Sequence, residues 1–531
     1  MTPSRALSVL LALCATATCL TTSAFELPTH ARNGRLWAMI QTESQAMFTV
    51  PTPELWFTQR HDHFASDDSK TFQQRFYESN TYWRSPDGPV ILYIGGEGAL
   101  TKTPGGYVDV LAKKWGAKVL ALEHRFYGKS VPNNDLSTPN YKYLKVEQAL
   151  ADLKYFKEQY EETLPAPHTH KWIAVGGSYP GALSAWFRIA YPNTTVASLA
   201  SSGVVDPVYE FYQFDEQVAL SAGEQCANAL RETTKAFEDE IKKGNATAVK
   251  GLLGAQDLCD ADFFYMVADA AAMAVQYGHK DVVCNHMTQA LEQKLSLTEE
   301  FANFTIEMYG KDFGSGCFYD TTCLINNPSK WADVRSWRWQ KCSQLAYFQV
   351  APKTGSIRSS IVDLDYHEKQ CQAVFGDVVN PKEGVKEIIK RYGGIHPKGH
   401  KIFYSNGGDD PWQRASVLKT ISDDQVANLA VCDLCGHCGD LRADPDSPEP
   451  LKKQRAEIME YLTKWLEEED VIEEAVQDAV KGPLKQVYRS SPFMLLPVLV
   501  AVGVLAVIVH KDLIRDSPTN RRAGYVRLEI A

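Results

Sequence analysis

A short apolar strand that passes through three small residues directly into a helix, between residues 171 and 188, constrains the fold more than any other stretch. The small residues are Gly176, Gly177 and Ser178, and Gly181 follows shortly after. A serine on such a sharp turn needs small neighbours because the backbone there is strained, and its hydroxyl projects from the carboxyl edge of a sheet. The pattern predicts a nucleophile elbow, although such glycine-rich turns also occur as packing or phosphate-binding turns.

One position departs from the usual elbow pattern G-x-S-x-G. Pro180 stands where the last glycine of that pattern would fall. A proline is tolerated in the first turn of a helix, because the N–H group that it lacks has no partner there. We therefore expect Pro180 to lie inside the first turn of the helix that follows Ser178.

Strands and helices alternate on both sides of this turn. Apolar runs bounded by turn residues predict buried strands at residues 90–98, 117–123, 171–175, 197–202 and 400–404. Helical spacing of apolar residues predicts helices at 145–160 and 449–468. Apolar strands that alternate with helices indicate a parallel sheet covered on both faces, and hence an α/β fold.

A long segment between the last two predicted strands has a different character. Residues 206–390 contain seven of the cysteines and show helical patterns, as at 224–243 and 262–277. The chain, at 531 residues, also exceeds the usual size of a single core. We interpret 206–390 as a helical cap inserted between two parts of one core, residues 25–205 and 391–470.

The two ends of the chain carry targeting features. Residues 1–24 have the basic, apolar and small-residue regions of a secretory signal peptide. An acidic stalk at 471–492 precedes 17 uncharged residues at 493–509, which predict a membrane span. Basic residues follow the span and predict a cytoplasmic tail at 510–531, hence a single-pass type I membrane protein.

The predicted tail contains Tyr525 and, three residues later, Leu528. This spacing resembles the tyrosine-based sorting signal of endosomal and lysosomal membrane proteins. It predicts a sorting adaptor as a partner of the tail and a lysosomal or endosomal location, with the cell surface as the alternative.

The predicted luminal part suits an oxidising compartment. Candidate glycosylation sites occur at Asn193, Asn245 and Asn303. Ten cysteines remain after the signal peptide, and we expect them to form disulfides whose pairing the sequence does not reveal. Cys432, Cys435 and Cys438 crowd together like metal ligands, but a zinc site would need a fourth ligand and a reducing history. We predict neither a metal nor a cofactor.

Two late segments supply the partners that a serine nucleophile needs. In α/β-hydrolases the acid and the histidine follow the serine in the order Ser, Asp, His. Asp410 follows the strand predicted at 400–404, and His437 comes after it. Asp409 competes with Asp410 for the role of the acid, and an aspartate or histidine in a loop is often only a surface residue. The order predicts an α/β-hydrolase fold with Ser178 as nucleophile.

Several short blocks carry a resemblance to one group of enzymes. The blocks are residues 57–64, 95–98, 123–130, 176–179, 337–342, 406–412 and 436–442. Together they resemble the serine peptidases that include lysosomal Pro-Xaa carboxypeptidase, dipeptidyl peptidase II and thymus-specific serine protease, over roughly residues 50 to 470. The resemblance implies an exopeptidase that cleaves peptides after proline or a small residue. It does not imply which end of the peptide is trimmed.

The resemblance also implies roles for individual residues. Ser178 is the nucleophile, Asp410 the acid and His437 the base, which takes the serine proton and returns it to the leaving amine. The oxyanion needs backbone donors, and the N–H groups of Tyr179 and of the loop at Gly96 are the natural pair.

Substrate contacts are expected from Glu97 and Trp412. The alternative for Glu97 is a structural carboxylate paired with Arg125 or Arg442. His124 and Arg125 are expected to stabilise the fold.

Other functions are weighed against the exopeptidase. A net charge of −10 without a long basic run excludes nucleic acid as a partner. An esterase or lipase could use the same three residues, and a catalytically silent adhesion or receptor module could keep the fold. The silent module normally loses its nucleophile or histidine, whereas this chain has both. Peptide substrates and the membrane are the expected partners, and a homodimer is left open.

Overall fold

The computed structural model describes residues 53–487 apart from 67–68, 167–168, 312 and 327–331. The chain divides into two compact units, Met1–Leu462 and Thr463–Ala531, and the sheet belongs to the first. The predicted signal peptide, the span at 493–509 and the tail with Tyr525 and Leu528 lie outside the described residues. Within the described part, no helix combines the length and the apolar character that crossing a membrane requires.

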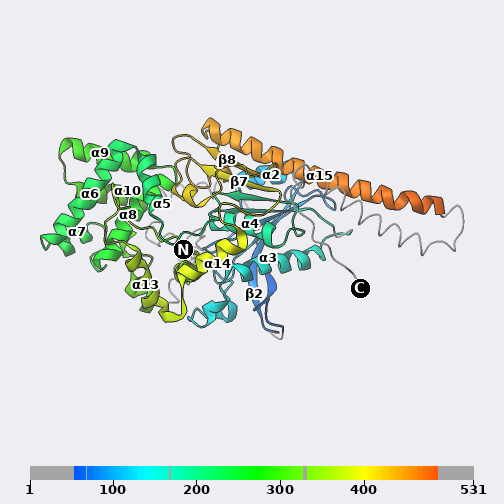
Figure 1. Cartoon of the computed structure of the whole chain (residues 1–531), viewed down its shortest axis with the longest axis horizontal. Coiled ribbons are helices and arrows are strands. Elements are labelled where there is room, and N and C mark those ends of the chain that lie inside the picture. The colour runs from blue at the N-terminus through cyan, green and yellow to red at the C-terminus, as the bar shows by residue number, and fades with distance from the viewer. Residues whose placement is uncertain (1–52, 67–68, 167–168, 312, 327–331, 488–531) are drawn as a thin grey trace, which may run out of the picture. The chain divides into compact units, whose positions relative to one another are not determined.

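A mixed sheet forms the centre of the first unit (Figure 1). Its strands are β1 (Leu55–Arg60), β2 (Thr71–Ser79), β3 (Val90–Ile94), β4 (Lys118–Leu122), β5 (Trp172–Gly177), β6 (Ala197–Ser201), β7 (Ile402–Gly407) and β8 (Gln425–Ala430). Their spatial order is β1-β2-β4-β3-β5-β6-β7-β8. Strand β2 pairs antiparallel with β1 and β4, and every other pairing is parallel. The predicted α/β class with a largely parallel sheet is confirmed.

The apolar strands occupy the middle of this sheet, as their sequences predict. Strands β4 and β6 are buried along their whole length, and β3 and β5 each have one half-buried residue. Central strands of a parallel sheet are covered on both faces, so each strand needs a continuous apolar run.

Three strands lie where the apolar runs predict none, namely β1, β2 and β8. Strands β1 and β8 form the two edges of the sheet, and their residues are only partly buried. Strand β2 alternates exposed and buried residues in its first half. Outer strands need an apolar surface on one face only, so they lack the continuous apolar signal.

Helices cover the sheet and extend beyond it. They are α2 (Tyr107–Trp115), α3 (Val146–Glu161), α4 (Tyr179–Ala190), α5 (Tyr212–Ala222), α6 (Glu224–Lys242), α7 (Ala246–Gly251), α8 (Asp260–Gln276), α9 (Lys280–Gln293), α10 (Leu297–Tyr309), α11 (Thr321–Asn326), α12 (Ala332–Gln340), α13 (Leu364–Phe375), α14 (Pro381–Tyr392) and α15 (Glu449–Val487). The helix predicted at 449–468 thus continues to Val487, through part of the expected stalk. The glutamates and alanines of that stretch favour a helix rather than interrupt it.

The segment expected to form the cap is helical. Residues 206–390 contain helices α5 to α14 and contribute no strand to the described sheet, and Figure 1 shows α5 to α10 gathered beside the strands. One hydrophobic cluster extends from the sheet, at Val90 and Trp172, into these helices, at Phe263 and Met308. The packing is therefore continuous, and the boundaries of the cap stay a prediction.

Disulfides cross-link residues within the helical segment and within the loop that follows β8. The bonded pairs are Cys226–Cys284, Cys317–Cys323, Cys342–Cys371 and Cys432–Cys435, whereas Cys259 and Cys438 form no disulfide. The expectation that all ten cysteines pair is therefore wrong for two of them. The three candidate glycosylation sites, Asn193, Asn245 and Asn303, are exposed and stay predictions.

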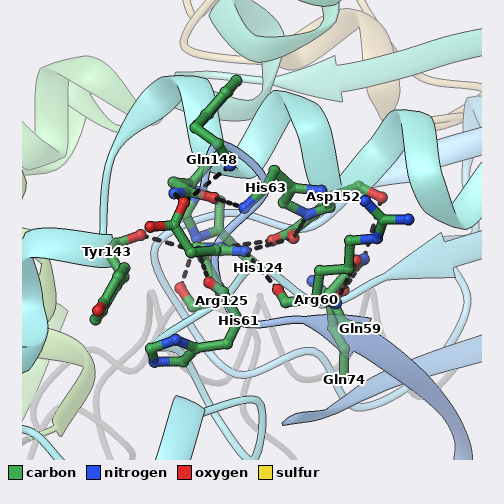
Figure 2. A network of polar contacts seen from close by, with 12 residues as sticks. Gln59, Arg60, His61, His63, Gln74, His124, Arg125, Tyr143, Gln148 and Asp152 are labelled. Atoms are coloured by element: carbon green, nitrogen blue, oxygen red, sulfur yellow. Dashed lines mark hydrogen bonds and ion pairs between the residues drawn. The ribbon is translucent and has the colours of Figure 1, made fainter. Parts of the chain in front are cut away.

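A buried ion pair joins the segment after β4 to helix α3 (Figure 2). The Arg125 guanidinium donates two 2.6 Å hydrogen bonds to the Asp152 carboxylate, and His63 contacts the same carboxylate at 2.8 Å. Arg125 also donates to the backbone carbonyls of His61 and Tyr143, each at 3.1 Å. Arg125 therefore stabilises the fold, as expected, by tying together three separate segments.

We expect Asp152→Asn to lower the free energy of unfolding by about 3–5 kcal/mol, because it leaves the Arg125 guanidinium buried without a counterion. Glu158→Gln is the matched control, because its ion pair with Lys154 is exposed and is worth about 0.5 kcal/mol or less. Urea denaturation measures both values. Equal effects of the two changes would contradict the assigned role of Asp152.

The same pair predicts a pH dependence. Burial alone would raise the pKa of Asp152, but the charge of Arg125 and its hydrogen bonds outweigh burial and lower the pKa below its ordinary value. A lowered folded-state pKa stabilises the protein above the pKa of the unfolded state, and this stabilisation is lost as the pH falls through the folded-state value. The difference between wild type and Asp152→Asn should therefore shrink below about pH 4 in urea titrations.

Candidate active site

The predicted strand-to-helix turn lies between β5 and α4. Ser178 has φ 66° and ψ −128°, outside the regions that side chains normally adopt. Its N–H donates to the carbonyl of Ser201 on β6 at 2.8 Å, and its carbonyl accepts from Ala182 at 3.0 Å. Hydrogen bonds on both sides hold the serine in this conformation.

Close approaches explain why the turn needs glycines. A Cβ atom on Gly176 would lie 2.1 Å from the carbonyl oxygen of Pro180, and one on Gly181 would lie 2.6 Å from that of Ser201. A Cβ atom on Gly177 would lie 2.9 Å from the Cys438 sulfur. The glycines thus let α4, β6 and the loop of His437 converge on Ser178.

Pro180 lies in the first turn of α4, as expected. Its ring abuts the loop after β3, because a Cβ atom on Gly96 would lie 2.6 Å from the Pro180 Cγ atom. The proline that breaks the usual motif is therefore a packing partner of the glycine loop.

His437 and Asp410 form a buried pair. His437 Nδ1 lies 2.7 Å from Asp410 Oδ2, and the two residues are 4% and 0% exposed. The other carboxylate oxygen of Asp410 accepts from the Trp412 N–H at 2.9 Å, which fixes the orientation of the carboxylate. The backbone N–H of His437 donates a 2.6 Å hydrogen bond to the backbone carbonyl of Gln276 on α8.

The electrostatics of this pair favour a charged histidine. Burial alone would lower the pKa of His437, but the Asp410 carboxylate and the adjacent Cys438 together raise the pKa well above its ordinary value. An imidazolium that forms during a reaction would be stabilised in the same way.

Asp409 has different partners. Its carboxylate pairs with Lys280 on α9 at 2.9 Å and accepts from the Leu434 N–H at 2.8 Å. Of the two competing acids, Asp410 is therefore the one that contacts His437.

Ser178 and His437 line the same cavity, which has a volume of about 360 Å³. Its walls come from residues 93–104, from the elbow and from the loop of His437, and we call it the glycine-loop cavity. No hydrogen bond joins Ser178 to His437 among the described residues. Such contacts are often long in the absence of substrate and shorten when it binds.

The expected oxyanion donors border this cavity. Tyr179 begins α4, so its N–H has no acceptor within the helix. The Gly95 N–H is bound to the carbonyl of Leu122, whereas Gly96 lines the cavity and its N–H has no acceptor in the described part of the chain. Of the two glycines, Gly96 is the one whose donor remains available.

The side chain of Tyr179 is buried beneath the site. Its hydroxyl accepts a 2.6 Å hydrogen bond from Gln340 and lies 3.1 Å from His124 Nε2. Because His124 Nδ1 faces the carbonyl of Arg125 at 2.7 Å, Nδ1 carries the proton and Nε2 accepts from Tyr179. Burial lowers the pKa of His124 to about 4, which agrees with a neutral, structural histidine.

Ser178 also lines a second cavity, of about 90 Å³. Its walls are mainly aromatic, and we call it the aromatic cavity. The residues that line it include Val204, Phe214, Tyr265, Asp269, Met273, Gln276, Tyr277, Trp337, Lys341, Tyr347, Gln349 and Trp412. One face of α8, Tyr265 to Gln276, provides a whole wall with helical spacing.

Glu97 and Trp412, the expected substrate contacts, both line the aromatic cavity, and Glu97 also lines the glycine-loop cavity. The alternative that pairs Glu97 with Arg125 is wrong, because Arg125 binds Asp152. Burial raises the pKa of Glu97. Trp412 donates to the Gln276 side chain at 2.9 Å, so its ring is fixed as a cavity wall.

Sequence reasoning missed two charged residues of the aromatic cavity, Asp269 and Lys341. Asp269 is a single charge inside an otherwise apolar stretch of α8, which is a visible signal. Lys341 lies inside the block at 337–342 that carries the family resemblance. Among the described residues, no cluster has the composition of a metal site, and Cys438 lies beside the carbonyl of Ser201.

Comparison with known proteins gives consistent matches. The family model for serine carboxypeptidase S28 matches residues 59–458. A probable serine protease of Arabidopsis thaliana, EDA2, is 39% identical over 448 residues, which cover 80% of this chain and 91% of that protein. The thymus-specific serine protease of Mus musculus is 27% identical, covering 78% and 87% of the two chains. The lysosomal Pro-X carboxypeptidase of the same species is 26% identical, covering 78% and 91%.

The family model spans most of the chain, and each of these relatives is matched over most of its length. The chain is therefore a serine peptidase and belongs to the serine carboxypeptidase S28 family.

Proposed function

We propose that this protein is a serine exopeptidase that cleaves peptides near one end through an acyl-enzyme, with Ser178, His437 and Asp410 as its catalytic triad. The observation that carries the proposal is the 2.7 Å contact between His437 and Asp410 in the wall of a cavity that Ser178 also lines. The fold is of the α/β-hydrolase class. Its support is the mostly parallel sheet, the elbow after β5, and the order of Ser178, Asp410 and His437 after three different strands.

The reaction follows from the positions of these groups. His437 takes the Ser178 proton as the hydroxyl attacks the scissile carbonyl, and Asp410 stabilises the imidazolium that forms. The N–H groups of Tyr179 and Gly96 stabilise the oxyanion. His437 then gives its proton to the leaving amine, and a water molecule hydrolyses the acyl-enzyme by the same route.

The two cavities give the substrate a direction. The leaving amine must lie beside the proton donor, and His437 lines the glycine-loop cavity. We therefore place the leaving group there and the acyl part of the substrate in the aromatic cavity. The walls of this cavity include Val204, Tyr347 and Trp412, which suit the ring of a proline or a small apolar residue.

The helical segment supports cleavage near a chain end. Tyr265, Asp269, Trp337 and Tyr347 of residues 206–390 form much of the aromatic cavity. A cavity walled by an insertion admits a short flexible end more easily than a folded chain. The resemblance to enzymes named for Pro-X cleavage supports a proline preference, and the sequence features at both ends support a membrane-bound protein of the lysosome or endosome.

We expect Ser178→Ala to abolish labelling by a fluorophosphonate probe and to abolish peptide cleavage. Asp410→Asn should lower kcat by about 10⁴-fold, because the histidine loses the partner that holds its tautomer. The matched control is Asp409→Asn. The Asp409 carboxylate pairs with Lys280 and not with His437, so this change should alter kcat less than tenfold. A wild-type protein that takes no probe would refute the enzymatic function, and probe labelling with only ester hydrolysis would favour an esterase.

The raised pKa of His437 predicts the pH profile. The base must be neutral to accept the serine proton, so kcat/KM should fall as the pH decreases through the pKa of the free enzyme. Because that pKa lies above the ordinary value of 6.5, the acidic limb of the profile should also lie above pH 6.5. Peptide hydrolysis measured from pH 4 to 9 tests this, and a limb near pH 5 would contradict the assigned charge state of His437.

Trimming of one peptide end is the expected specificity. The full-length protein is incubated with peptides that carry proline near either end, and the products are identified by mass spectrometry. We expect loss of residues from one end only, after proline. Internal cleavage alone would contradict the exopeptidase assignment while leaving the triad intact.

A further inference from the structure

Three basic side chains gather around one aromatic ring at the wall of the aromatic cavity. The guanidinium carbons of Arg338 and Arg358 each lie 5.7 Å from the centroid of the Tyr265 ring, and Lys341 Nζ lies 5.8 Å from it. Tyr265 and Lys341 both line the cavity, and Lys341 is only 3% exposed. Lysines are seldom this deeply buried without a partner of opposite charge.

The carboxylates nearby leave Lys341 without a counterion. Asp215 is engaged by Arg358 through hydrogen bonds of 2.6 and 2.9 Å, and Asp269 lies 3.8 Å from the same arginine. In the described part of the chain, neither Arg338 nor Lys341 forms an ion pair. The cluster therefore holds three basic side chains and two carboxylates, and both carboxylates lie nearest Arg358.

Hydrogen-bond donors are in excess at the same place. Lys341 Nζ has two long contacts of 3.3 Å, to the Tyr265 hydroxyl and to the side-chain oxygen of Gln349. The Nη1 atoms of Arg338 and Arg358 are buried and have no hydrogen-bond partner. Buried donors are nearly always satisfied in folded proteins. The two arginines are not among the residues that line the aromatic cavity, so their guanidinium groups add to the positive field around Lys341.

The backbone around Lys341 has features that are frequent at functional sites. Lys341 opens a π-helical turn, η5 (Lys341–Leu345), directly after α12. Two buried non-glycine residues with positive φ follow it, Ala346 at 51° and Tyr347 at 47°. Such strained residues persist where the surrounding structure holds them in place. Here they direct Lys341 and Tyr347 to the wall of one cavity.

We propose that the aromatic cavity binds a carboxylate of the peptide substrate and that Lys341 is the residue that contacts it. This inference rests on the proposed function, because it assumes that a peptide occupies the cavity beside Ser178. The carboxylate would accept a hydrogen bond from Lys341 and would be the counterion of its ammonium form. Lys341 is thus a specificity-determining residue, and Arg338 and Arg358 strengthen the positive field around it.

The protonation of Lys341 agrees with this role. Burial, followed by the charge of Arg338, lowers the pKa of Lys341 in the absence of substrate, and Asp269 opposes this only in part. A bound carboxylate favours the charged form, so the ammonium and its counterion would be buried together. Asp269, whose pKa burial raises to about 6, competes with the substrate carboxylate for the same cations.

The carboxylate has two possible sources. With the acyl part of the substrate in the aromatic cavity, it belongs to an aspartate or glutamate side chain that precedes the cleaved residue. With the opposite orientation, it is the free carboxyl terminus of the peptide. The test distinguishes these sources with two matched peptide pairs, one that has Asp or Asn immediately before the proline, and one that has a free or an amidated carboxyl terminus.

The full-length protein is assayed on both pairs, with fluorophosphonate labelling of Ser178 as a separate readout of the catalytic site. We expect kcat/KM to be about tenfold or more higher for the Asp peptide than for the Asn peptide, as for one buried charge-assisted contact. The carboxyl-terminal pair should differ little. A preference for the free terminus instead supports the carboxylate site and overturns the orientation.

Variants of the cluster locate the effect. Lys341→Met should abolish the preference for the carboxylate peptide, and Lys341→Arg should retain it. Fluorophosphonate labelling shows whether each variant still folds with a reactive Ser178. Asp269→Asn should increase the preference, because a competing carboxylate is removed. If Lys341→Met does not fold, the wild-type peptide pairs and Asp269→Asn still decide the question.

Cleavage of both members of each pair at equal rates would overturn the carboxylate site while leaving the proposed function in place. A loss of cleavage in Asp269→Asn together with a gain in Lys341→Met would show that the cavity binds the amino terminus of the substrate, and would also overturn the proposal. A wild-type protein without probe labelling or cleavage would refute the proposed function itself.

Discussion

The convergence of strand β5, helix α4, strand β6 and the loop of His437 on three glycines is the constraint on which the site depends. Ser178 keeps a positive φ only because its N–H is bound to Ser201 and because no Cβ atom at Gly176 or Gly177 obstructs the neighbouring chain. Any larger residue there would separate the serine from the loop that carries the histidine. The active-site geometry is therefore a consequence of backbone packing first and of side-chain chemistry second.

Buried polar contacts then fix the segments that bring the remaining groups. Asp440, three residues after His437, accepts hydrogen bonds from Ser201 at 2.5 Å and from Ser405 at 2.7 Å, so the histidine loop is tied to the ends of β6 and β7. A second buried contact, between Arg125 and Asp152, anchors the segment that follows β4 to helix α3. These contacts explain how residues far apart in the sequence hold one geometry around Ser178.

The sequence predicts the parts of the fold whose environment is uniform. Central strands such as β4 and β6 are apolar throughout, and the elbow has its own steric signature, so both are visible without a structure. The edge strands β1 and β8 are not predicted from the sequence, because burial on one face leaves a mixed polar and apolar pattern that also fits a loop. The sequence also does not predict whether Glu97 pairs with an arginine. An ion pair depends on distances between side chains, which residue spacing does not supply.

The sequence by itself determined the order Ser178, Asp410 and His437, the strained turn and the family, because these depend on local sterics and on short motifs. The resemblance already favoured Asp410 over Asp409, but only the tertiary structure shows their partners, since Asp410 contacts His437 whereas the adjacent Asp409 pairs with Lys280. The tertiary structure also decided that Lys341, Arg338 and Arg358 surround the ring of a tyrosine that lines the same cavity as the nucleophile. Charge balance in a buried cluster is a property of three-dimensional neighbours, and no linear pattern records it.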